Sequence, residues 1–222
     1  MKKSKQDMPS RREVFEFMTK ESQPYRFEYV KESQPLRVNV EKKVIYVNEQ
    51  VLLSVIKDLI NAGLDWKEVM KKNLKHEKAH EKFFEWNLKW ASSGNGAESY
   101  GWLASYLTDI VIDKIYYAND SQYQKWLIAD SRHAFNITKR DLWKLFPNPH
   151  NRPAFLYNQA AYWVAIGAIT FEEAIELYPE KASYIIELSK LFQKIKSEKD
   201  LEWAFPHAKA LFFKHFGLHI QR

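Results

Sequence analysis

The chain contains no cysteine among its 222 residues. This absence excludes disulfide bonds, thiolate catalysis and every metal site that uses cysteine. A bound metal ion would therefore need histidine, aspartate and glutamate as its ligands. The chain also lacks an apolar run of about 18 residues, the length that a membrane-spanning helix requires. No apolar stretch follows the basic start, so we expect no secretory signal, no membrane partner and a cytoplasmic protein.

The net charge of +6 and the isoelectric point near 9.2 raise the question of nucleic-acid binding. Basic and acidic residues alternate along most of the chain, however, which is not the clustered pattern of a binding groove. The densest basic excess lies in the first twelve residues. A solvated tail over residues 1–10 explains this excess more simply than a nucleic-acid interface does.

The pattern of apolar residues predicts an α+β fold. Residues 25–47 alternate apolar and polar side chains and are rich in β-branched and aromatic types, which indicates a small antiparallel or mixed sheet. The tetrapeptide ESQP occurs at 21–24 and again at 32–35, each time before an extended run, and we interpret it as a turn used twice. From residue 48 onward the periodicity is helical, so a mostly helical body follows the sheet.

Caps and breakers place the helices. Ser10 and Asp65 are expected N-caps, and Gly63 ends the helix expected at residues 48–63. We divide the chain into the tail at 1–10, a metal-binding unit at 11–118 and a helical portion at 119–222 that packs on it, in one compact domain. The expected helices cover residues 11–20, 48–63, 65–90, 98–117, 121–130, 138–146, 153–167, 171–178, 180–196 and 199–215.

The sequence His76-Glu77-Lys78-Ala79-His80 has the spacing of a zinc site on a helix. Two histidines four residues apart project from one helix face, so both imidazoles can bind one zinc ion. Glu77 lies about 100° around the helix from His76, where a carboxylate can act as a general base. The alternative is an exposed, charged helix face with two solvated histidines.

A third zinc ligand is expected from the helix over residues 98–117. Asp109 and Asp113 lie four residues apart in the otherwise apolar run LTDIVIDKIYY. Buried carboxylates are costly unless a cation or hydrogen-bond donors satisfy them. One aspartate can bind zinc, and the other can orient a histidine through its second ring nitrogen. Alternatively, Asp113 pairs with Lys114 or an arginine and Asp109 lies at the surface.

The order of these segments resembles the minimal zincin metallopeptidase unit. A strand (KKVIYVN), a helix (QVLLSVIKDLINAG), the His-Glu-x-x-His helix and an Asp-x-x-x-Asp helix follow one another, over about residues 36–118. This order is similar to that of HtpX-type, minigluzincin-type and VWA-associated predicted metallopeptidases. The resemblance implies a zincin-like body, a Zn²⁺ cofactor, Asp109 as third ligand and Asp113 as the residue that orients a ligand. The sequence departs from the family in the charged residues around the motif, namely Lys75, Lys78, Glu81 and Lys82.

The resulting hypothesis is a zinc-dependent hydrolase that cleaves a peptide bond in a peptide or protein substrate. Glu77 is the expected general base. His133, in the segment SRHAFN that we expect to form a loop, is the first candidate to stabilise the oxyanion. Further candidates for that role are His150, Arg152, Tyr157 and Tyr162. Two other functions stay open, an inactive zincin-fold interaction module and a basic helical protein that binds nucleic acid.

Overall fold

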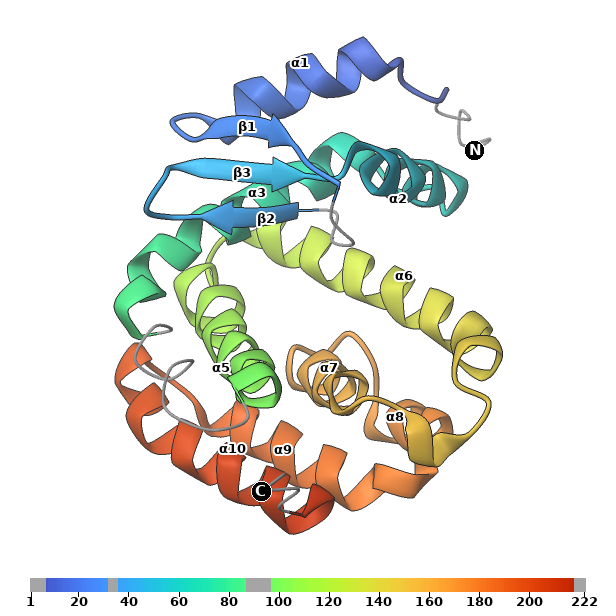
Figure 1. The fold of residues 1–222 in the computed structure, drawn as a ribbon, viewed down its shortest axis with the longest axis vertical. Coiled ribbons are helices and arrows are strands. Elements are labelled where there is room, and N and C mark those ends of the chain that lie inside the picture. The colour runs from blue at the N-terminus through green and yellow to red at the C-terminus, as the bar shows by residue number, and fades with distance from the viewer. Residues whose placement is uncertain (1–6, 32–35, 87–96, 218–222) are drawn as a thin grey trace. The chain divides into compact units, whose positions relative to one another are not determined.

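A computed structural model describes residues 7–31, 36–86 and 97–217 (Figure 1). The chain divides into two compact units, Met1–Lys82 and Phe83–Arg222. The predicted metal-binding unit at 11–118 therefore includes residues of both. A small sheet near the N-terminus and a mostly helical remainder confirm the α+β class. Every helix within the described residues is too short or too polar to span a lipid bilayer.

The described residues of the first unit form three strands and three α-helices. The sheet is mixed. Its central strand β3 (Val44–Val47) is parallel to β1 (Arg26–Tyr29) on one side and antiparallel to β2 (Leu36–Asn39) on the other. The first ESQP segment ends a helix and turns into a strand, as expected, whereas the second lies outside the described residues. The elements are α1 (Arg11–Ser22), β1 (Arg26–Tyr29), β2 (Leu36–Asn39), β3 (Val44–Val47), α2 (Glu49–Asn61) and α3 (Trp66–Ala79).

The expected caps of the first unit are confirmed. The Ser10 side chain accepts a hydrogen bond from the backbone N–H of Glu13, and Asp65 accepts from two backbone N–H groups of α3. Gly63 has a φ of 72°, which a helix end of this kind favours. The apolar faces of the helices and β3 form the core of the unit, with Val14, Met18, Ile45, Leu52, Ile56, Leu59, Trp66, Val69 and Leu74 buried.

The expected long helix at 65–90 is less regular than predicted. Its α-helical part ends at Ala79, a 3-10 turn, η1, covers His80–Phe83, and residues 84–86 are helical again. The last part of the predicted range, residues 87–90, lies outside the described residues. The second histidine of the motif therefore stands where the helix tightens, not in its middle.

The second unit is helical throughout its described part. Its elements are α5 (Ala97–Val111), a π-helical segment η2 (Ile112–Tyr116), α6 (Ser121–Leu145), η3 (Pro149–Asn151), α7 (Ala154–Ala165), α8 (Phe171–Leu177), η4 (Pro179–Lys181), α9 (Ala182–Lys194), η5 (Glu198–Asp200) and α10 (Leu201–Phe216). Helix α6 corrects the prediction of two helices at 121–130 and 138–146 separated by a loop. Its sequence contains no glycine or proline, and Asp120 caps its start, so its polar residues do not interrupt it.

Helix α7 lies at the centre of the second unit. It packs against α5, α8 and α9, and α10 packs against α5 and α9 (Figure 1). Nine of its twelve residues are buried, including Ala160 and Ala161, whose small side chains let neighbouring helices approach closely. This central position places Tyr162 in the interior, beside the helix that carries the two candidate aspartates.

Candidate metal centre

The motif histidines form a close pair at the end of α3 in the first unit. His76 belongs to the last turn of the helix, and His80 begins η1 directly after it. The centroids of their imidazole rings lie 4.9 Å apart, with the ring planes at 81°. Both side chains are half-buried. Two imidazoles at this separation are suited to share one metal ion, because the donor nitrogens of both rings can be brought to about 2 Å from it.

Two of the charged residues around the motif, Lys78 and Glu81, have structural partners within the first unit. The Nζ of Lys78 donates to the backbone carbonyls of Glu21 and Gln23, at 2.9 and 3.2 Å. Glu81 accepts a hydrogen bond from the hydroxyl of Tyr25 at 2.7 Å and another from Lys43. The bond from Lys43, ahead of the one from Tyr25, lowers the pKa of Glu81.

These contacts give the two charged residues a structural role. Lys78 and Glu81 fasten the end of α3 to the turn that joins α1 to β1. Their charges thus hold the histidine-bearing segment in place. Glu77, between Lys78 and His76, is half-buried.

The two candidate aspartates belong to the second unit. Asp109 is half-buried near the end of α5, and Asp113 is fully buried in the π-helical segment η2. Single π-turns of this kind are rare and occur often at functional sites. The Nζ of the neighbouring Lys114 donates to the backbone carbonyl of Ala165 at 2.8 Å. Its partner is therefore this carbonyl and not Asp113, the partner that the sequence suggested as an alternative.

Two tyrosines hold the carboxylate of Asp113. The hydroxyl of Tyr123 donates to Oδ1 and the hydroxyl of Tyr162 donates to Oδ2. In addition, the side-chain amide of Gln124 donates to the backbone carbonyl of Asp113. A carboxylate offers about four acceptor positions, so Asp113 can accept a further hydrogen bond while both phenols stay in place.

The same tyrosines experience the charges of both aspartates. Burial is the largest cause that raises the pKa of Tyr123 and Tyr162, and the charges of Asp113 and Asp109 raise it further. Burial, followed by the charge of Asp109, also raises the pKa of Tyr106. These phenols therefore stay protonated at neutral pH, and those of Tyr123 and Tyr162 act as hydrogen-bond donors. Of these three tyrosines, only Tyr162 could be named as a candidate from the sequence, and there for a different role, stabilisation of the oxyanion.

The other candidates for oxyanion stabilisation lie elsewhere in the second unit. His133 is on α6, not in a loop, and its Nε2 atom is buried without a hydrogen-bond partner among the described residues. Arg152 and Tyr157 both donate to Oε1 of Glu180, at 2.8 and 3.1 Å. His150 is exposed in η3. None of the contacts described for these residues includes Asp109 or Asp113.

The candidate residues thus form two groups, each ordered within its own unit. His76, Glu77 and His80 are held at the end of α3, and Asp109 and Asp113 lie among buried tyrosines in the second unit. Nitrogen and oxygen donors of these types fit zinc, a borderline-soft cation. Comparison with known proteins found no matching family model, no similar curated protein and no similar solved structure.

Proposed function

We propose that the chain is a zinc-dependent hydrolase of peptide bonds, with a zincin-like arrangement of its ligands. His76 and His80 from the first unit and Asp109 from the second bind one zinc ion in this proposal. The single observation that carries it is the pair of half-buried imidazoles 4.9 Å apart with Glu77 beside them. Three protein ligands and one open coordination position are the usual composition of a catalytic zinc site.

Zinc held by these residues would supply a Lewis acid that activates water at neutral pH. The side chains of the chain then have separate roles. The carboxylate of Glu77 accepts the proton of the attacking water and afterwards delivers it to the nitrogen of the leaving amine. Asp113 orients a zinc-binding histidine by accepting a hydrogen bond from its second ring nitrogen.

The tyrosine contacts support this role for Asp113. Residues that bind a metal need neighbours that fix their direction, and those neighbours need fixed positions themselves. Tyr123 and Tyr162 hold both carboxylate oxygens of Asp113 in a fully buried position. His133 is retained as the candidate that stabilises the oxyanion, because a buried imidazole Nε2 can donate a hydrogen bond when it carries the proton.

Zinc content tests this proposal. We expect about one zinc ion per chain in protein that was purified without a histidine tag, as for other single catalytic sites. The variants His76→Ala, His80→Ala and Asp109→Ala should each lose most of this zinc, measured by elemental analysis after dialysis. His150→Ala is the matched control, because this histidine is exposed in η3 and belongs to neither candidate group.

A chain that contains no zinc, even after zinc is supplied, would contradict the proposal. A zinc content that falls equally in His150→Ala would contradict the ligand set. In the first case the basic helical protein that binds nucleic acid becomes the better account, and its DNA binding should weaken steeply with salt.

A further inference from the structure

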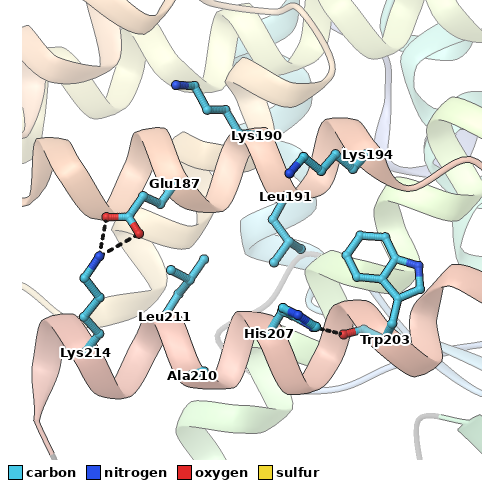
Figure 2. A pocket seen from close by; sticks show the side chains of 9 residues that line it. All are labelled: Glu187, Lys190, Leu191, Lys194, Trp203, His207, Ala210, Leu211 and Lys214. Atoms are coloured by element: carbon cyan, nitrogen blue, oxygen red, sulfur yellow. Dashed lines mark hydrogen bonds and ion pairs between the residues drawn. The ribbon is translucent and has the colours of Figure 1, made fainter.

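A groove runs between α9 and α10 in the second unit, and its lining contains none of the proposed zinc ligands. Its volume is about 440 Å³. Leu191 and Leu211 provide its apolar surface, and the exposed ring of Trp203 stands at one end (Figure 2). The ion pair between Glu187 and Lys214 lies at the other end. The groove thus offers an apolar strip between an aromatic wall and a charged wall.

The aromatic wall is fixed before any ligand arrives. The indole Nε1 of Trp203 donates to Oδ1 of Asp200 at 2.9 Å. The Nδ1 of His207 lies 2.7 Å from the backbone carbonyl of Trp203, and a carbonyl can only accept, so Nδ1 carries the proton of this bond. The two rings meet edge to face, with centroids 5.7 Å apart. A ligand therefore loses little free energy in ordering this wall.

One rim of the groove carries two lysines of α9. Lys190 and Lys194 are exposed and four residues apart on α9, so they project from one face. Neither forms an ion pair with any residue in the described part of the chain. The dipole of α9 accounts for a lysine in the last turn, where Lys194 lies, but not for Lys190 one turn earlier.

At the end of the groove away from Trp203, the positive charge of Lys214 is neutralised by an ion pair with Glu187. Lys214 contacts both carboxylate oxygens of Glu187, at 2.9 and 2.8 Å, and His215 lies 3.2 Å from the same carboxylate. The hydrogen bond from Lys214 is the largest cause that lowers the pKa of Glu187. Most of the excess positive charge at the groove therefore comes from Lys190 and Lys194.

We propose that this groove binds an acidic amphipathic helical segment of a partner protein. Apolar side chains of the segment lie on Leu191 and Leu211 beside Trp203. Acidic side chains one turn apart on the same segment pair with Lys190 and Lys194, which are spaced by one turn as well. The carrying observation is this combination of an apolar strip, a fixed exposed tryptophan and two cationic side chains that form no ion pair with the described residues.

A helical peptide suits the groove better than a small carboxylate does. Pockets for small ligands usually enclose most of the ligand surface, whereas this groove is open to solvent and its Trp203 is 36% exposed. A helix needs to bury only one face, so an open groove between two helices is sufficient. One carboxylate also cannot neutralise two lysines, while a peptide with two acidic residues can.

The test uses a fluorescein-labelled 14-residue peptide with leucines at positions i, i+4 and i+7 and glutamates one turn apart on the adjoining face. Binding to the full chain is followed by fluorescence anisotropy. We expect saturable binding that the double variant Lys190→Glu/Lys194→Glu weakens at least about tenfold, because both attractive contacts become repulsive. Leu211→Gln should weaken it as well. Glu187→Gln should strengthen it, because Lys214 then becomes available to the peptide.

Two controls distinguish binding in the groove from nonspecific attraction between opposite charges. The double variant Lys196→Glu/Lys199→Glu has the same change in net charge at exposed lysines that do not line the groove, and it should bind within about threefold of the original chain. A peptide whose leucines are replaced by serine should bind much more weakly than the original peptide.

Three results would overturn the proposal. One is equal binding of the leucine and serine peptides. Another is equal weakening by the two double variants. The third is saturable binding of dodecanoate in the groove with no binding of the peptide, which would make the groove a site for a small amphiphile. Neither the expected result nor these outcomes depends on zinc, and the His76→Ala variant should bind the peptide as the original chain does.

Discussion

Replacing Glu77 by glutamine is expected to lower kcat for peptide hydrolysis by at least about a hundredfold, while zinc stays bound. Glutamine has nearly the same shape as glutamate but cannot accept the proton of the attacking water. The two imidazoles 4.9 Å apart are not altered by this change, so the metal should be retained. Turnover of a quenched fluorescent peptide library and zinc content, measured on the same preparation, check both halves of the prediction.

Glu85→Gln is the matched control for Glu77→Gln. Glu85 is an exposed glutamate eight residues further along the chain, and it belongs to neither candidate group. This control variant should hydrolyse the library at the rate of the original chain. Equal rates for the Glu77 variant and the original would show that this carboxylate is not the general base, and zinc retained without any turnover in the original chain would favour an inactive interaction module.

The second large effect concerns stability. The double variant Tyr123→Phe/Tyr162→Phe removes both phenol donors from the fully buried carboxylate of Asp113. Taking away the partners of a buried charge costs about 3–5 kcal/mol of unfolding free energy. Each single variant should cost about 1.5–3 kcal/mol, as expected for a hydrogen bond to a charged group. Urea titration followed by circular dichroism measures these differences.

Tyr178→Phe provides the comparison for the two tyrosines. Tyr178 is also buried, but its hydroxyl has no hydrogen-bond partner among the described residues. Its loss should therefore change the unfolding free energy by less than about 0.5 kcal/mol. A double variant as stable as Tyr178→Phe would mean that the phenols do not sustain the charge of Asp113.

Local features of the fold could be predicted from the sequence where one residue determines them. Ser10 and Asp65 cap helices because their side chains accept from nearby backbone N–H groups. The alternation in residues 25–47 predicted the strands, but not that β3 lies between β1 and β2. Strand order depends on packing between segments, which alternation does not encode. The loop expected at SRHAFN was wrong because polar residues without glycine or proline continue α6.

The candidate site shows the same division between local and distant contacts. The spacing of His76 and His80 predicted a close pair, since four residues make about one helical turn. The burial of Asp113 was predicted from its apolar surroundings. Its donors could not be identified, because Tyr123 is 10 residues away and Tyr162 is 49 residues away. The helix break after Ala79 was also missed, since the sequence there contains no breaker.

The central claim is that His76, His80 and Asp109 bind one zinc ion. An anomalous difference map at the zinc absorption edge, from crystals of the zinc-loaded chain, tests it most directly. The predicted result is one strong peak about 2.0–2.1 Å from a ring nitrogen of each histidine and about 2.0–2.2 Å from a carboxylate oxygen of Asp109. A peak at the histidine pair without Asp109, or zinc bound only elsewhere in the chain, would contradict it.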